Sequence, residues 1–224
     1  MGVTPRMPPL VFKQGGEYAG LEVDFARSLG AELGRPVRFV EVNWEDLITA
    51  LLERKIDIIM SGMSITPERQ VRIGFASPYL HSGQMALCRA ENAATVQVSL
   101  LWGKLRVGYQ KGTTGEYFVQ RNLNQAIRTG FSEPAEGARS LAKKKIDVFI
   151  DDAPVTWWLA SENETAGLIV LNSLLTDEYL AWGLRKDDTE LLTAANRFIE
   201  EAKQDGRLKA MVLKWTGSLG GGAR

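Results

Sequence analysis

The sequence alternates between strand-like and helical segments, and it does so in two separate series. In the first series, the alternating stretch 37–42 is followed by a helix expected over 44–55 and by the apolar run 56–60. The second series begins with a strand at 105–109, and its first helix starts near Glu116. Strands that alternate with helices are typical of parallel sheets covered by helices on both faces. We therefore predict an α/β protein of two lobes, each a mostly parallel sheet flanked by helices.

Helices account for much of the remaining chain. Apolar residues recur every four positions from Leu21 to Leu33, which is the spacing of an amphipathic helix. Further helices are predicted over 134–145, 154–162, 189–204 and 208–215, and a strand over 146–150. No internal repeat and no nucleotide-binding motif is evident in the sequence.

Two extended segments, 84–89 and 179–185, are the only ones that can join the two series. We expect them to act as crossover hinge strands, because the chain must pass from one lobe to the other and back. Lobe 1 is then discontinuous, with residues 1–87 and 184–224, and lobe 2 comprises residues 88–183.

Length and composition narrow the class of protein. The 224 residues suit two lobes of about 100 residues each. Lys plus Arg equals Asp plus Glu at 27 each, so no net charge attracts nucleic acid or an anionic membrane. No apolar run approaches the roughly 20 residues that a membrane span requires. We expect a globular protein with no nucleic-acid partner.

Cysteine and histidine each occur once, as Cys88 and His81. A single cysteine excludes an intramolecular disulfide and a cysteine-based zinc site, and a single histidine excludes a multi-histidine metal site. We interpret Cys88 as a small buried apolar residue and expect neither a metal nor a cofactor.

The chain begins without a visible secretory signal, since Met1 to Thr4 lie in what is predicted to be a strand. Two interpretations remain open at this point. The chain is either cytoplasmic, or a mature domain that has been cut from a longer precursor.

The first candidate binding element is the segment 61–69, which follows a buried strand, where open α/β sheets bind their ligands. Gly62 would let a ligand approach the backbone closely, and Ser64 offers a hydroxyl. Arg69 could donate a bidentate pair of hydrogen bonds to a carboxylate. The alternative is a helix N-cap at Thr66 followed by an ordinary surface arginine.

Two more candidate elements follow strands of the second series. Thr113 and Thr114, after Gly112, could bind an anion with backbone N–H groups at a helix N-terminus, or they could form an ordinary glycine turn. Asp151 and Asp152 follow the strand 146–150 and could accept from an ammonium, or could cap the next helix. Two anion-binding elements and one cation-binding element together match a zwitterion.

Several longer motifs carry a resemblance to a known family. They are the segment Phe12–Asp24, Asp57–Arg69, Phe75–Tyr79, Gly112–Thr114, Asp147–Asp152, Gly183–Lys186 and Lys214–Trp215. With them the chain resembles, over essentially its whole length, the periplasmic amino-acid-binding proteins of ABC importers (bacterial extracellular solute-binding proteins, family 3). Its glutamine- and histidine-binding members are the most similar in these motifs. The resemblance implies the periplasmic binding protein type 2, or Venus-flytrap, fold.

The resemblance also implies roles for the candidate residues. Arg69 would hold the α-carboxylate of an amino acid, and the amide of Thr114 would add a second contact. Ser64, the backbone at Gly62, and Asp152 would receive the α-ammonium.

The resemblance places the ligand side chain between Met7 and Trp44, where most members have two aromatic rings. Met7 departs from the family pattern, and so does Thr4, because members that bind cationic amino acids often have Asp there. Asp151 could substitute for that Asp. These departures favour a neutral or polar amino acid. Arg6 would favour an acidic one, unless it is a solvated surface residue.

The function implied is that of an extracytoplasmic solute-binding protein. Such a protein captures a small amino acid in the cleft between its lobes and delivers it to a membrane ABC permease. The resemblance therefore implies a protein that is not an enzyme and is periplasmic or otherwise extracytoplasmic, and we expect a monomer.

Two alternatives use the same fold. Cyclohexadienyl dehydratases resemble this chain at Trp44 and in the segment 60–65, but their catalytic glutamate is matched here by Val155, which cannot transfer a proton. Asp151 or Glu178 would have to replace that glutamate. The other alternative is a ligand-sensing domain of a receptor.

Overall fold

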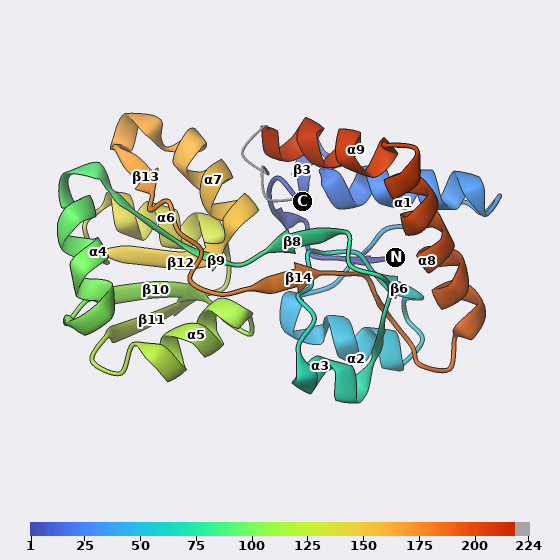
Figure 1. Ribbon diagram of the computed structural model, residues 1–224, viewed down its shortest axis with the longest axis horizontal. Coiled ribbons are helices and arrows are strands. Elements are labelled where there is room, and N and C mark those ends of the chain that lie inside the picture. The colour runs from blue at the N-terminus through green and yellow to red at the C-terminus, as the bar shows by residue number, and fades with distance from the viewer. Residues whose placement is uncertain (218–224) are drawn as a thin grey trace. The chain divides into compact units, whose positions relative to one another are not determined.

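The computed structural model describes residues 1–217, except for the side chains of residues 101 and 102. The chain divides into two compact units (Figure 1). Unit 1 comprises residues 1–81 together with those from 178 onward, and unit 2 comprises residues 82–177. The boundaries that we predicted from the sequence, at 87/88 and 183/184, lie a few residues later at both crossings.

The central sheet of unit 1 is mixed. Strand β1 (Gly2–Val3) lies between β5 (Val40–Glu41) and β6 (Ile58–Ile59) and is parallel to both. Strand β15 (Gly183–Leu184) is antiparallel to β6 on one side and to β7 (Gly74–Phe75) on the other. The last part of the chain therefore completes a sheet that the first part begins.

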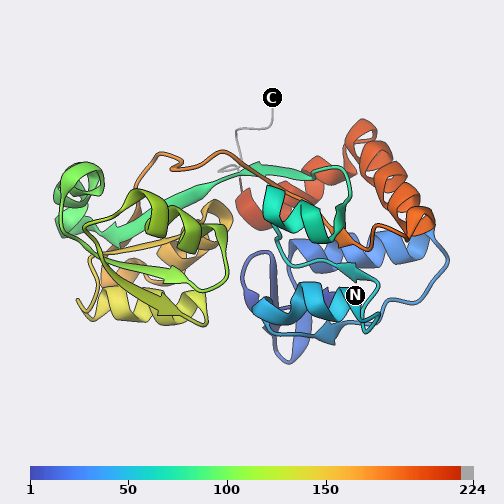
Figure 2. The ribbon, with the colours of Figure 1, turned by 90° about the horizontal axis from the view of Figure 1, so that it is seen from below.

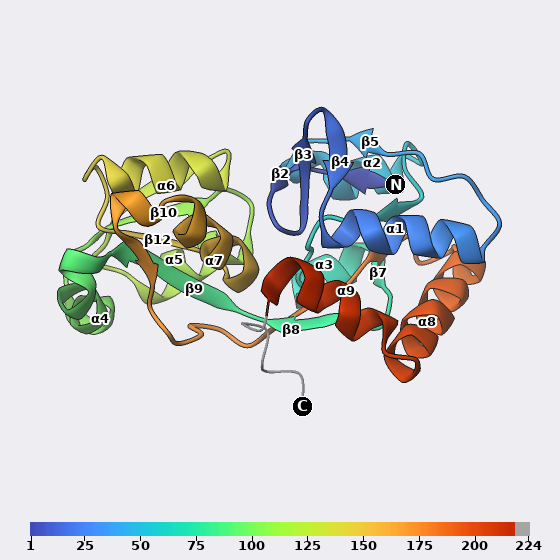
Figure 3. The same cartoon turned by 90° about the horizontal axis from the view of Figure 1, so that it is seen from above.

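Helices cover both faces of this sheet, with α1, α8 and α9 on one side and α2 and α3 on the other (Figures 1 and 3). Their bounds are α1 Leu21–Glu32, α2 Leu47–Leu52, α3 Pro67–Arg72, α8 Thr189–Gln204 and α9 Arg207–Thr216. A 3₁₀ turn at Trp44–Asp46 precedes α2, where the sequence had predicted one continuous helix over 44–55. None of the helices in the described part of the chain combines the length and the apolar character that a membrane span needs.

Two small sheets complete unit 1, of which the first is antiparallel. Strands β2 (Arg6–Met7), β3 (Val11–Gln14) and β4 (Glu17–Ala19) form a meander. Strands β8 (Leu80–Ser82) and β14 (Glu178–Leu180) pair with each other where the chain crosses between the units.

The sheet of unit 2 is also mixed, with the strand order β11-β10-β12-β9-β13. The strands are β9 Gln84–Arg89, β10 Arg106–Gln110, β11 Ile127–Phe131, β12 Val148–Asp152 and β13 Leu168–Val170. Strands β10, β11 and β12 are parallel, and β9 runs antiparallel to both β12 and β13. Helices α6 (Pro134–Ala142) and α7 (Ala153–Glu162) lie on one face and α5 (Thr114–Asn122) on the other (Figures 2 and 3).

The segments expected to be crossover hinge strands, 84–89 and 179–185, begin one to two residues beyond the crossings at 81/82 and 177/178. Residues 84–89 are β9, an inner strand that is buried along its whole length. Part of the second segment is β15, an inner strand of unit 1. An apolar extended segment can be a connection or a fully buried strand, and sequence pattern alone does not separate the two. The sequence also failed to identify α4 (Ala93–Trp102) and β11.

The two units share a local structural motif that was not evident as a repeat in the sequence. Arg54 after α2 and Lys144 after α6 both have φ of 58°, and each is followed by Lys-Ile-Asp and a strand. In each unit a buried arginine donates to one carbonyl in the last turn of the helix and to one just before the next strand. Arg185 Nη1 contacts Ile56 O (2.7 Å) and Leu51 O (3.4 Å), and Arg89 Nη1 contacts Ile146 O (2.9 Å) and Leu141 O (2.7 Å).

Candidate functional site

Arg69 lies in the short helix α3, whose start is set by Pro67 and by Thr66. The Thr66 hydroxyl accepts a hydrogen bond from the Arg69 amide (3.2 Å), so the predicted N-cap is present. The side chain of Arg69 is nevertheless only 9% exposed and is not an ordinary surface charge. Its Nη1 donates to Ser64 O (2.8 Å), and the guanidinium carbon lies 5.4 Å from the centre of the Trp44 ring. The cap and the buried arginine therefore occur together.

Ser64 links Arg69 to a carboxylate that sequence reasoning had considered only as a catalytic alternative. The Ser64 hydroxyl donates to Glu178 Oε2 at 2.6 Å, while its carbonyl accepts from Arg69. Ser64 is buried and Glu178 is partly buried. Both of the polar groups of Ser64 are thus oriented by charged side chains.

Gly62 has a structural reason to be glycine. Its φ is +69°, and a Cβ atom would lie 2.6 Å from Leu10 Cδ1. Its N–H donates to Glu22 Oε1 at 2.6 Å. The backbone atom of Gly62 that could accept a hydrogen bond from a ligand ammonium is its carbonyl oxygen, because an N–H group only donates.

Glu22 was not identified from the sequence, although it orders this segment. Its side chain is fully buried and accepts from Gly62 N, from Tyr79 Oη (2.6 Å) and from Trp182 Nε1 (3.0 Å). Burial raises the pKa of Glu22 to about 7, although each of the three hydrogen bonds lowers it. An acidic residue at the start of an amphipathic helix is common, so the sequence did not indicate that Glu22 would be buried and accept three hydrogen bonds.

The residues expected around the ligand side chain differ in accessibility. Trp44 is partly buried and lies over Arg69, whereas Met7 in β2 is only 1% exposed. Thr4 is also buried, and its hydroxyl donates to Val42 O (2.8 Å). The Thr4 amide donates to the Ser61 hydroxyl (3.0 Å). In this structure Trp44 offers more surface than Met7 does.

In unit 2, Gln84 brings two of the predicted site residues together. Its Nε2 donates to Asp152 Oδ1 (2.5 Å) and to the Thr114 hydroxyl (2.9 Å), and its side chain is only 1% exposed. A Cβ atom at Gly115 would lie 2.7 Å from Gln84 Oε1, so a larger residue there would displace the Gln84 amide. No sequence motif pointed to Gln84, since its partners are 30 and 68 residues away.

The two aspartates divide their roles. Asp152 occupies the N-cap position of α7, but its side chain makes no capping hydrogen bond. Its carboxylate is directed to Gln84 instead, while Asp151 Oδ1 accepts from the Asp152 amide (2.8 Å). The capping interpretation of Asp152 is therefore wrong. Asp151 is 2% exposed and Asp152 is 7% exposed.

Some polar groups of the glycine turn before α5 already form hydrogen bonds within the protein. Gly112 N donates to Glu116 Oε2 (2.7 Å), and the Thr113 hydroxyl donates to Gln110 O (2.7 Å). Thr113 is the N-cap residue and Thr114 is the first residue of the helix. The Gly112 amide is thus committed within the turn, and the anion site expected at Thr113 and Thr114 stays a prediction.

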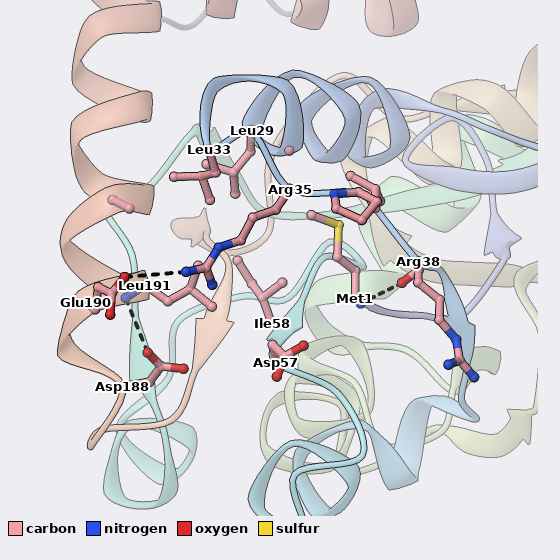
Figure 4. A pocket seen from close by; sticks show the side chains of 14 residues that line it. Met1, Leu29, Leu33, Arg35, Arg38, Asp57, Ile58, Asp188, Glu190 and Leu191 are labelled. Atoms are coloured by element: carbon pink, nitrogen blue, oxygen red, sulfur yellow. Dashed lines mark hydrogen bonds and ion pairs between the residues drawn. The ribbon is translucent and has the colours of Figure 1, made fainter.

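A separate cavity of about 350 Å³ in unit 1 contains none of the candidate residues (Figure 4). Leu29, Leu33, Ile58 and Leu191 supply apolar walls. Arg35 and Glu190 form an ion pair there at 3.6 Å, and the Met1 ammonium donates to Arg38 O (2.8 Å).

Cys88 and His81 take no part in a metal cluster within the described residues, where no group of three or more His, Cys, Asp or Glu side chains converges. Cys88 is fully buried, and burial raises the pKa of its thiol to about 11. The interpretation of Cys88 as a small buried residue is confirmed.

Comparisons with known proteins agree with this architecture. Residues 1–218 match the model of the bacterial extracellular solute-binding proteins, family 3. The L-cystine-binding protein TcyJ of Escherichia coli (strain K12) is 30% identical over 222 residues, covering 97% of this chain and 82% of that protein. The histidine-binding periplasmic protein of Salmonella typhimurium (strain LT2) is 29% identical over 226 residues, covering 96% and 86%.

Solved structures are similar over the same length. The ancestral amino acid-binding protein AncCDT-1, a precursor of cyclohexadienyl dehydratase, has a TM-score of 0.88 and 33% identity, covering 96% of this chain and 93% of that one. A putative ABC-transporter binding component from Wolinella succinogenes DSM 1740, complexed with lysine, has a TM-score of 0.91 and 29% identity, covering 96% and 94%.

The two mixed α/β sheets and these matches define a binding protein with the periplasmic binding protein fold. The chain belongs to the bacterial extracellular solute-binding proteins, family 3, whose members named above are amino-acid-binding proteins and an ABC-transporter component. It is a binding protein rather than an enzyme, and it works outside the cytoplasm. The sequence-based expectations of family, fold and extracytoplasmic location are confirmed.

Proposed function

We propose that this protein captures a free amino acid with a neutral or polar side chain and delivers it to a membrane ABC permease. The observation that carries the proposal is the buried guanidinium of Arg69, held by Ser64 O and lying beside Trp44. A planar guanidinium matches a carboxylate in a bidentate geometry, and partial burial strengthens the interaction. Arg69 would bind the α-carboxylate.

Unit 2 carries two further groups whose chemistry suits an amino acid. Asp152, held by Gln84, would accept from the α-ammonium, and the N-terminus of α5 at Thr113 and Thr114 would add a contact to the carboxylate. These assignments follow from the chemistry of each group. The carboxylate of Asp152 accepts hydrogen bonds only, and backbone N–H groups only donate.

The preference for a neutral or polar side chain is supported by Thr4. Its hydroxyl is uncharged and donates to Val42 O, so it adds no negative charge for a cationic side chain. Trp44 and Met7 are apolar and would contact the hydrocarbon part of the ligand. The relative named as L-cystine-binding takes an amino acid of this polar class.

A cationic amino acid is the second candidate, and specific observations favour it. Glu178 lies beside Ser64 and Asp151 precedes Asp152, so two additional carboxylates are close to the proposed site residues. The arginine-binding protein 1 of Escherichia coli and the lysine complex from Wolinella succinogenes are relatives with such ligands.

Isothermal titration calorimetry with wild type and with Arg69→Ala tests the proposal. Removing Arg69 leaves the ligand carboxylate without its charge-assisted hydrogen bonds, which we expect to weaken binding by at least about 2 kcal/mol. Arg72→Ala is the matched control, because Arg72 is an exposed arginine on the same helix. Normal binding by Arg69→Ala would show that the carboxylate is held elsewhere.

A further inference from the structure

The direction of one hydrogen bond restricts what Ser64 can do for a ligand. The Ser64 hydroxyl donates to Glu178 Oε2 at 2.6 Å, and a carboxylate oxygen can only accept. A serine hydroxyl has one proton and two lone pairs. With its proton directed at Glu178, Ser64 can offer a ligand only lone pairs. It is therefore suited to an ammonium and not to a carboxylate.

The main chain fixes this arrangement. Ser64 and Leu180 form an isolated antiparallel bridge. Two hydrogen bonds flank it, from Ile65 N to Tyr179 O (2.9 Å) and from Ala181 N to Met63 O (3.0 Å). Glu178 lies at the start of the paired strand β14, so its position relative to Ser64 is set by the backbone as well as by the side chain.

Through its carbonyl oxygen, Ser64 also orients Arg69, the residue proposed to bind the ligand carboxylate. Its carbonyl accepts from Arg69 Nη1 at 2.8 Å, which orients the guanidinium. One residue thus places a donor for a carboxylate and an acceptor for an ammonium close together. In an α-amino acid these two groups are attached to the same carbon.

We propose that Glu178 is a specificity-determining positioning residue: it holds the Ser64 hydroxyl as an acceptor, so that the site selects α-amino acids over carboxylates that lack the α-amino group. The inference rests on the proposed function, because it takes Arg69 as the carboxylate ligand. Glu178 acts through Ser64.

The test compares Glu178→Gln, Ser64→Ala and the double variant by calorimetry. The probes are L-cystine, L-arginine, L-histidine, L-lysine and L-glutamine, each paired with the same molecule lacking its α-amino group. In Glu178→Gln the side-chain amide can donate to Ser64 and turn its hydroxyl away from the acceptor role. We expect the amino acid that binds wild type to lose about tenfold or more in affinity, since a hydrogen bond to a charged group is weakened. Its deaminated analogue should change by less than about twofold.

The double-mutant cycle separates positioning from a direct charge effect. We expect Glu178→Gln to have no further effect once Ser64 is alanine. Asp177→Asn removes the neighbouring exposed carboxylate and should bind as wild type does. Circular dichroism confirms that each variant is folded.

Each outcome decides the inference. Equal losses for the amino acid and its analogue, or a Glu178→Gln effect that persists on Ser64→Ala, would overturn it. If Arg69→Ala abolishes binding while Glu178→Gln binds normally, only this inference fails and the proposed function stands. If neither L-cystine nor any of the twenty amino acids binds the wild-type protein, both fail together.

Discussion

At the scale of single residues, Glu22 makes a prediction about pH. Its pKa in the folded protein is about 7, above the ordinary value of 4.5, so the folded state retains a proton that the unfolded chain releases between these values. This contribution to the free energy of unfolding is fully present below pH 4.5 and is lost as the pH rises to about 7. The change is of the order of 3 kcal/mol.

Urea denaturation at pH 5 and at pH 7.5 measures this effect. Glu22→Gln cannot titrate, so its stability should decline less than that of wild type over this range. The variant should also be less stable at pH 5, because a glutamine amide cannot accept from all three donors. Glu17→Gln, at an exposed position, is the control. Identical pH dependence in wild type and Glu22→Gln would contradict the assignment.

Residues differ in how far sequence could predict them. Arg69 and Asp152 were predicted because each follows a buried strand inside a recognisable motif. Glu22 and Gln84 were not, because their partners are distant in sequence. Trp182 is 160 residues from Glu22, and Asp152 is 68 residues from Gln84. Such contacts arise only when the chain folds.

At the scale of elements, we expect the free energy of unfolding to fall when a buried arginine that donates to backbone carbonyls is replaced. Arg89 is 5% exposed and donates to Leu141 O in the last turn of α6 and to Ile146 O shortly before β12. Arg89→Met would remove the guanidinium from Ile146 O and from Leu141 O, which would keep only its bond from Lys144 N (3.0 Å), and we expect a loss of about 2 kcal/mol. Arg89 Nη2 also lies 3.8 Å from Asp147 Oδ1. Arg106 forms an ion pair with Asp147 as well (2.6 Å) but is 42% exposed, so Arg106→Met should cost less. Urea denaturation measures both, and equal losses would contradict a structural role for Arg89.

Elements were predicted where their pattern is periodic. The helix expected over 189–204 is α8 with the same bounds, because its apolar residues form one stripe. Helix α4 is apolar on most sides and has no such stripe, so its sequence did not indicate a helix. The strand expected over 37–42 is reduced to Val40–Glu41, since only these residues pair with β1.

At the scale of the whole molecule, each of the two units contains a five-stranded mixed sheet. Unit 1 takes its strands from both ends of the sequence, and unit 2 takes its strands from the middle. The alternation of strands and helices predicted two lobes. The family match over residues 1–218 spans both of them. The antiparallel strands β9 and β15 could not be predicted, because their direction depends on which neighbours they pair with.

The central claim is that this protein binds a free amino acid, and a thermal-shift screen of the wild-type protein against the twenty amino acids and L-cystine tests it most directly. A ligand present at a hundredfold excess over its Kd stabilises the folded state by about 2.7 kcal/mol, which raises the melting temperature by several degrees. We predict such a shift with at least one of these compounds and its absence in Arg69→Ala. No shift with any of them would contradict the account.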